Sequence, residues 1–348
     1  MTPVGRDPRR RRVTVKDVAA AANVSPMTVS NVINGRHQFV SEATRKLVEK
    51  EIARLNYRVQ ESARGLRTAY RRSVGIAIVD ETRSFLSDHF NAQVVAGLSN
   101  VLSRNNHTLM VQGIPPRQFS KSMVVQNFAV DGFCVIMSGP PARRREIVET
   151  LIKLDQPVVL IQETGAPEAP DICVVRQDDD GGARVLADHF AARRPSRYLV
   201  IRPETEWAAI EARVSAFCQA TARLAPEAKV DTIRTETEDF DSVQASVAAY
   251  LDSQPLPAAI FGANDRLAIG AMLLLQARGI AIPDQVRIAG FNGFESRRYA
   301  RPLITTVMSP AYALGERAGQ ALLDRFAEQQ FRERDIVLPV HLDFGETT

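Results

Sequence analysis

The chain has 348 residues, of which 45% are hydrophobic and 24% are charged, and its formal net charge is +4. This composition is that of an ordinary globular protein and excludes a disordered or fibrous chain, while the length predicts two or three domains. The small net charge conceals an asymmetry: residues 1–72 hold 16 basic and 6 acidic side chains, a net +10, whereas the remainder holds 28 basic and 34 acidic, a net −6. A basic front end on a mildly acidic body is typical of a protein that binds a polyanion.

The first residues end in a run of arginines, without an apolar stretch or a small-residue cleavage site, so we expect no secretory signal. No apolar run approaches the ~20 residues that a membrane helix needs. The cysteines Cys134, Cys173 and Cys218 are far apart, odd in number and without a CxxC pair. They indicate reduced structural thiols rather than disulfides or a zinc site, and therefore a cytoplasmic protein.

Three short helices are predicted after the arginine run. Thr14 followed by Asp17 predicts a capped start of the first helix, Ser25 caps the second, and Ser41 caps the third. The apolar stripe of the third helix is predicted at Ala43, Leu47, Ile52 and Leu55. Two short helices joined by a three-residue turn, with a third as support, form a helix-turn-helix unit, although any small three-helix bundle is the alternative. The small polar face of the second helix and the surrounding positive charge favour DNA binding.

A long stretch then carries a family resemblance. VTVKDVAAAANVSPMTVSNVINGRHQFVSEATRKLVEKEIARLNYRVQESARGLRT (Val13 to Thr68) resembles the DNA-binding headpiece and hinge of the lactose-repressor (LacI) family of bacterial transcription regulators, and among them the gluconate- and sugar-responsive repressors. The resemblance implies a nucleoid-associated repressor that binds pseudo-palindromic double-stranded operator DNA as a homodimer. It implies a basic tail at 1–12, a helix-turn-helix domain at 13–58, and a hinge helix with its linker at 59–72.

The resemblance also nominates the residues that read DNA. Base readers on the second helix are Pro26, Met27, Thr28, Ser30 and Asn31. Asn31 is the best candidate for direct readout because an Asn amide can pair with both N6 and N7 of adenine, and its alternative is an ordinary surface residue. Leu66 matches the leucine that the family's hinge helix wedges into the central base step, and its alternative is a buried linker contact. Further predicted DNA contacts are Thr14, Asn34, Arg36, Tyr57, Ser62 and Ala63.

From Ser73 onward, buried-strand runs alternate with helical runs. The strand-like runs include SVGIAIVD, DGFCVIM, PVVLIQE, DICVVRQ, RYLVIRP, AAIFGAND and RIAGFN. This order predicts two α/β subdomains, each with a parallel sheet covered on both faces. The segments AVDGFCVI, RQDDDGGARVLADHF, AAIFGANDRLAIGA, IPDQVRIAGFNGFE and RPLITTV resemble the same family's core, which has the fold of periplasmic sugar-binding proteins. The resemblance implies a core at 73–344, with subdomain one at 73–162 and 292–325 and subdomain two at 163–291 and 326–344.

A small-molecule effector is expected in the cleft between these subdomains, because ligands of open α/β sheets bind beyond the carboxyl ends of the strands. The predicted cleft residues are those at or just after the ends of predicted strands: Asp80, Gln162, Asn264, Asp265 and Asn292. Arg213 matches the family's effector-holding arginine, and Trp207, the only tryptophan, is placed to stack on a sugar face. A surface salt bridge is the alternative for Arg213, and a helix cap is the alternative for Asp265. Since the neutral Asn292 replaces a familiar Asp, we expect a sugar or sugar acid rather than a purine.

No catalytic or metal motif stands out. The acidic run Asp178 to Asp180 lacks EF-hand spacing and is better explained as the acidic start of a helix. The chain contains no GxSxG or Walker sequence, and its five histidines form no ligand-spaced pair. We therefore expect no metal, no cofactor and no enzyme activity.

Two other protein classes share part of these features. A sugar-binding transport protein would share the body but not the basic headpiece, and an architectural DNA protein would have no use for a clefted body. The helix from Leu267 to Ala277 and the helix after Ser87 are the expected dimer surfaces. The family's effectors either induce or co-repress, and the sequence does not fix which applies here.

Overall fold

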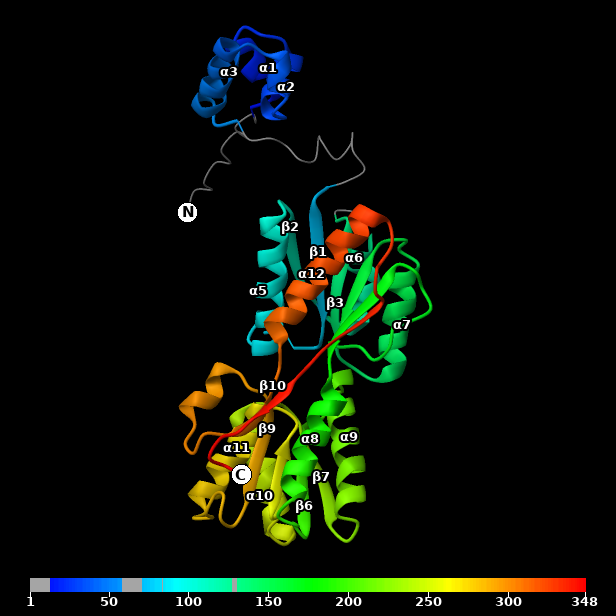
Figure 1. Ribbon diagram of the computed structural model, residues 1–348, viewed down its shortest axis with the longest axis vertical. Helices are drawn as coiled ribbons and strands as arrows, with labels where there is room; N and C mark the ends of the chain where they lie inside the picture. Colours follow the sequence, from blue (N-terminus) through cyan, green and yellow to red (C-terminus); the bar gives the residue numbers. More distant parts are fainter. Residues whose placement is uncertain (1–12, 58–70, 83, 127–129) are drawn as a thin grey trace, which may run out of the picture. The chain divides into compact units, whose positions relative to one another are not determined.

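The computed structural model describes residues 13–57, 71–82, 84–126 and 130–348. The chain divides into two compact units between Arg71 and Arg72, and each unit is described by itself (Figure 1). Within the described ranges no helix is long and apolar enough to span a membrane.

The first unit is a small bundle of helices. Its elements are α1 (Val15–Ala21), α2 (Pro26–Ile33), the 3-10 helix η1 (His37–Phe39) and α3 (Glu42–Arg54). The three predicted caps are present, because the hydroxyls of Thr14, Ser25 and Ser41 each accept a hydrogen bond from a backbone N–H in the first turn that follows. Asn23 has φ 50° in the turn between α1 and α2. This left-handed residue lets the chain reverse within three residues, as a helix-turn-helix requires.

The predicted stripe of α3 is wrong in its first half. Leu47 is 43% exposed and Ala43 is also exposed, whereas Val48 is fully buried beside Val18 and Val29. Counting forward from Val48, the inward positions recur at Ile52 and Leu55, which pack on the same core. The phase of the helix is thus set by Val48, one residue after the predicted position.

The second unit contains two six-stranded sheets. The first has the order β11 (Asp335–Leu338), β5 (Ile172–Gln177), β4 (Val158–Ile161), β3 (Gly132–Met137), β1 (Ser73–Val79) and β2 (Thr108–Ile114), with all neighbours parallel. The second has the order β12 (His341–Asp343), β10 (Thr305–Met308), β9 (Arg287–Asn292), β8 (Ala259–Gly262), β6 (Arg197–Pro203) and β7 (Lys229–Thr235), with only β12 antiparallel.

Helices cover both faces of each sheet, as predicted. Those of the first sheet are α5 (His89–Arg104), η2 (Pro116–Lys121), α6 (Met123–Gln126), α7 (Pro141–Ile152) and α12 (Ala311–Glu328). Those of the second are α8 (Asp179–Ala191), α9 (Ala208–Leu224), α10 (Phe240–Ser253) and α11 (Asp265–Ala277), with η3 (Glu295–Tyr299) after β9. Alternate residues of β1 show the two layers, since Ile76 faces the cluster under α5 and α12 while Ala77 faces the one under α7.

The predicted subdomain boundaries are wrong. The strand β5 was expected in subdomain two but pairs with β4 in the first sheet, and β10 was expected in subdomain one but pairs with β9 in the second. The strand β11 also belongs to the first sheet, and the residues after 344 belong to the core, where Thr347 is completely buried. The chain therefore crosses after Gln177, after Met308 and between Leu338 and His341 (Figure 1). A buried strand is recognisable from its own residues, but the sheet that it joins depends on distant partners.

Candidate functional site

The exposed face of α2 is the candidate nucleic-acid surface of the first unit. Met27, Asn31 and Asn34 are spaced four and three residues apart, so they lie on one side of the helix. Met27 is 67% exposed and Asn31 is half-buried. Within the described residues no hydrogen bond occupies the Asn31 amide, whereas Asn34 donates to the Ser30 carbonyl at 2.7 Å. This face therefore offers one unengaged amide group beside an exposed thioether.

A cavity between the two sheets of the second unit is the candidate ligand site. About 570 Å³ of empty space, including open solvent at its mouth, lies within it. Its lining is Asp88, Phe90, Asn91, Ile136, Met137, Ile161, Gln162, Trp207, Ala208, Ala209, Ile210, Arg213, Glu238, Asn264 and Asn292. Trp207 packs against the hydrophobic clusters of both subdomains, so the only tryptophan lies where the two subdomains meet.

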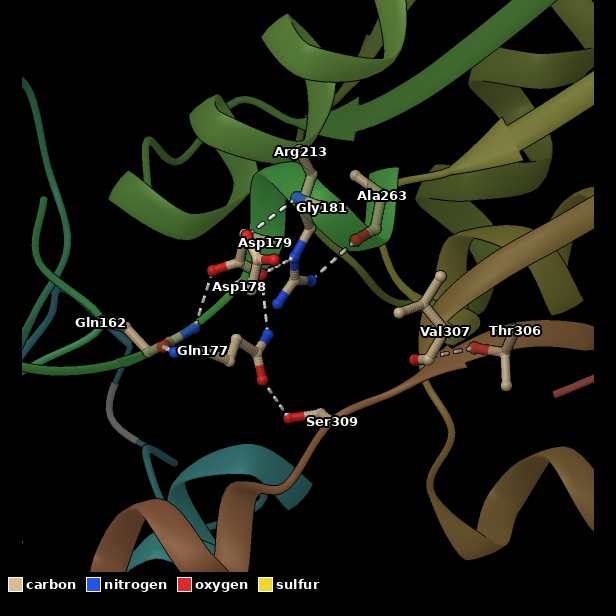
Figure 2. A network of polar contacts seen from close by, with 10 residues as sticks. All are labelled: Gln162, Gln177, Asp178, Asp179, Gly181, Arg213, Ala263, Thr306, Val307 and Ser309. Atoms are coloured by element: carbon tan, nitrogen blue, oxygen red, sulfur yellow. Dashed lines mark hydrogen bonds and ion pairs between the residues drawn. The ribbon is translucent and has the colours of Figure 1, made fainter. Parts of the chain in front are cut away.

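Arg213 is buried in the wall of this cavity by α9. Its Nε donates to Asp179 Oδ1 at 2.7 Å and its Nη1 donates to the Ala263 carbonyl at 2.9 Å (Figure 2). The guanidinium also lies 3.9 Å from the centroid of the Phe291 ring. The charge of Arg213 is therefore paired inside the protein, and Nη2 forms no hydrogen bond within the described residues.

A network of hydrogen bonds connects Arg213 to the crossing segments. Gln162 donates to Asp179 Oδ2 at 3.1 Å, and Gln177 donates to Asp179 Oδ1 at 2.7 Å. Ser309 donates to Gln177 Oε1 at 2.5 Å, which ties the second crossing to the first (Figure 2). Burial raises the pKa of Asp179, and the positive charge of Arg213 opposes that shift. The cavity wall and the segments that cross between the two sheets thus share one polar network.

The second wall carries an acidic group that the strand ends did not reveal. Glu238, in the loop after β7, accepts a hydrogen bond from Asn264 at 2.9 Å, while Asn264 also caps α11. Burial raises the pKa of Glu238, and the negative charge of Asp88 raises it further. Asp88 lies on the opposite subdomain, where it caps α5. Two carboxylates therefore face one cavity from two subdomains.

Comparisons with known proteins match both units of the chain. Residues 14–60 match the model of bacterial regulatory proteins of the lacI family, and residues 187–348 match a periplasmic binding protein-like domain. The HTH-type transcriptional repressor PurR of Vibrio atlanticus is 28% identical over 96% of this chain and 97% of its own length. The lac repressor dimer bound to operator and an anti-inducer has a TM-score of 0.84 at 22% identity, covering 97% of this chain and 99% of that one.

The chain carries a lacI-family DNA-binding domain and a periplasmic binding protein-like domain. It is a DNA-binding transcription regulator with a ligand-binding core, not an enzyme. A solved regulator, CelR in complex with cellobiose, is 25% identical with a TM-score of 0.69, covering 97% of this chain and all of that one. A LacI-family regulator of Enterococcus faecium with bound ribose has a TM-score of 0.67 at 22% identity, covering 79% of this chain and 98% of that one.

The structure brings five of the seven predicted effector residues to one cavity: Gln162, Trp207, Arg213, Asn264 and Asn292. The other two, Asp80 and Asp265, lie outside its lining. Asp80 Oδ1 accepts from the Thr82 amide at 2.6 Å, and both oxygens of Asp265 are engaged inside the second subdomain. Both side chains follow strands, but they accept hydrogen bonds from other parts of their own subdomain and do not line the cavity.

Several predicted DNA contacts have internal partners. Thr14 forms a capping box with Asp17, and Thr28 hydrogen bonds to Ser25 through its hydroxyl at 2.9 Å. Tyr57 packs on the headpiece core, and its burial raises the pKa of its phenol. Pro26 occupies the first turn of α2, and Arg36 is exposed after it. The predicted hinge contacts Ser62, Ala63 and Leu66 lie outside the described residues and stay predictions.

The sequence prediction missed Asp88, Phe90, Asn91 and Glu238. These residues lie in or just after the loops that follow β1 and β7, several positions beyond the strand ends. Counting the whole loop after each strand as cavity lining would have included Asp88 and Glu238, whereas Phe90 and Asn91 lie in the first turn of α5. The acidic run has separate roles: Asp178 caps α8, Asp179 binds Arg213, and Asp180 lies 4.0 Å from Arg184.

Proposed function

We propose that this regulator is a repressor that binds a pseudo-palindromic operator as a homodimer in the bacterial cytoplasm and responds to a sugar-sized effector in the inter-subdomain cavity. The observation that carries the DNA-binding part is the exposed face of α2, with the unengaged Asn31 amide beside Met27. A recognition helix reads the major groove through such a face, and a two-fold dimer matches two half-sites. A transport role is disfavoured, because a transport protein has no use for this headpiece.

The cavity supports a sugar without a carboxylate better than a sugar acid. The argument for an acidic ligand relied on Arg213, whose charge Asp179 already balances. Asp88 and Glu238 add two acidic groups to the lining. The relatives with bound cellobiose and ribose show that sugars occupy such cores in similar proteins, which supports a sugar for this one.

Selection of operator sequences from random DNA, followed by titration of Asn31→Ala, tests the DNA-reading role. We expect the wild-type protein to select a pseudo-palindrome. The Asn31→Ala protein should lose about 1–3 kcal/mol of discrimination at one base pair in each half-site, because it lacks the bidentate amide contact.

Arg36→Ala is the comparison, since removal of a phosphate contact should weaken binding equally for all sequences and reduce the salt dependence. If Asn31→Ala weakened the affinity for operator and for random DNA equally, Asn31 would contact the DNA backbone and not a base. Failure to select any two-fold sequence would contradict the proposed operator binding itself.

A further inference from the structure

The cavity carries one carboxylate on each of its two walls. Asp88 comes from the first subdomain and Glu238 from the second, and both line the cavity. Burial raises the pKa of Glu238, and the negative charge of Asp88 adds to that rise. Neither carboxylate forms an ion pair within the described residues. Arg266 is the cation that most lowers the pKa of Glu238, but it is exposed to solvent and its effect is smaller than that of Asp88.

The remaining polar groups of the cavity add a further acceptor. Asn292 Oδ1 is buried and has no hydrogen-bond partner among the described residues. It lies on a residue with φ 106°, a strained conformation for a non-glycine residue that is held in place where β9 ends. A buried acceptor without a partner is costly, and a donor on a bound ligand removes that cost.

The positive charge of Arg213 balances these groups only in part, because it lowers the pKa of Glu238 less than the charge of Asp88 raises it. The Arg213 guanidinium forms an ion pair with Asp179, and the pair is almost completely buried. The lining therefore carries an excess of negative charge and acceptors between two walls. Those walls approach closely at the cavity's edge, where the Gly139 amide of the first subdomain donates to the Glu206 carbonyl of the second at 2.7 Å.

We propose that the effector carries a cationic nitrogen, as an amino sugar does, and that this group is held between Asp88 and Glu238. The sugar ring then packs against Trp207 and Phe90, and a hydroxyl or ammonium donor satisfies Asn292. Such a ligand links the two subdomains through charge, because it replaces the repulsion of two carboxylates with two attractions. This inference rests on the proposed effector role of the cavity and adds the chemical class of the effector.

Fluorescence titration of the full-length protein tests this proposal, because Trp207 is the only tryptophan and lies in the cavity. The probes are glucosamine, galactosamine and mannosamine, each compared with its parent hexose and its uronic acid. We expect at least one amino sugar to give a saturable change with a dissociation constant at least about tenfold below those of its parent and its uronate, since a hydrogen-bonded charge pair is worth that much.

Asp88→Asn and Glu238→Gln should each remove most of that preference. Asn remains a good cap for α5, and Gln can still accept from Asn264, so both variants are expected to fold. Asp284→Asn and Glu227→Gln, which remove exposed carboxylates outside the cavity, are the matched controls and should leave the preference unchanged. A parent hexose or uronate that binds as tightly as the amino sugar, or the absence of any saturable change with the amino sugars, overturns the inference.

A second measurement needs no ligand. Because the two carboxylates repel each other across the empty cavity, the double variant Asp88→Asn/Glu238→Gln should melt about 2–4 °C above the wild type at pH 7.5, whereas the control double variant should not. An unchanged melting temperature overturns the inference. Operator selection is independent of both readouts, so failure of the DNA-binding proposal and failure of this one are distinguishable.

Discussion

At the scale of single residues, Asp265 shows how a side chain that follows a strand can serve the fold instead of a ligand. Its Oδ2 accepts from the Gly293 amide at 2.7 Å, and its Oδ1 accepts from the Thr306 hydroxyl at 2.6 Å. These bonds join α11 to the ends of β9 and β10. Burial nevertheless raises the pKa of Asp265 to about 6, because the hydrogen bonds offset only part of the desolvation.

Asp265→Asn should make stability less dependent on pH. The folded-state pKa of about 6 lies above the ordinary 3.8, so the folded protein binds this proton more tightly, and the stability it contributes is lost as the pH rises from about 4 to about 6. The loss is at most about 3 kcal/mol for a shift of this size. Urea unfolding of both proteins between pH 4 and pH 7 measures it, with Asp284→Asn as an exposed control. If the unfolding free energies of the wild type and of Asp265→Asn changed with pH in parallel, burial of the Asp265 charge would not explain the pH dependence.

At the scale of elements, β2 is the feature that most resembles an interface. It is an edge strand of the first sheet beside α5, and Met110 and Val111 are exposed on it. Exposed apolar residues on an edge strand invite pairing with another chain. The predicted helical dimer surfaces expose fewer large hydrophobic side chains. On the helix from Leu267 to Ala277, Leu273 is the one such side chain that is exposed.

Val111→Glu should therefore weaken the proposed dimer. A carboxylate placed in an apolar interface loses its hydration without gaining a partner, which raises the dissociation constant. Sedimentation velocity over a range of concentrations measures the change. Val185→Glu, at a valine of similar exposure on α8 in the second subdomain, should leave the dimer intact. Equal dimer stability in both variants would exclude β2 from the interface.

At the scale of the whole molecule, one network of hydrogen bonds joins the cavity wall to the segments that cross between the two sheets. Arg213 binds Asp179 at the start of α8, and Gln177 connects Asp179 to Ser309. Ligand in the cavity and movement of the crossings therefore act on the same hydrogen bonds. Any coupling is reciprocal: if a ligand changes operator affinity by a given factor, the operator changes ligand affinity by the same factor.

Arg213→Met should destabilise the core by about 3–5 kcal/mol, because it leaves the Asp179 carboxylate buried without its counter-charge. Asp179→Asn/Arg213→Met should recover part of this loss, since neither charge is then buried alone. The free energy of unfolding in urea measures both effects. Arg184→Met removes an exposed arginine on α8, the helix that carries Asp179. It should change stability by no more than about 0.5 kcal/mol. A small effect of Arg213→Met would argue against a buried ion pair.

The sequence by itself determined the elements and their local ends. The caps at Thr14, Ser25 and Ser41 were predictable because they depend on residues within one helical turn. The α/β class and the two parallel sheets were also predictable, since buried strands and helices alternate along the chain. These features are local, so the residues that decide them are neighbours in sequence.

Only the tertiary structure decided which sheet each crossing strand joins and which polar groups meet in the cavity. Of the two partners of β5, the strand β11 is more than 150 residues away, and no pattern within either strand specifies that pairing. Asp88 and Glu238 are likewise brought together by the approach of two subdomains. The sequence nominated Arg213 for its charge, but Asp179 cancels that charge in the folded protein. Pairing and electrostatic balance depend on distances between remote residues, and folding alone sets those distances.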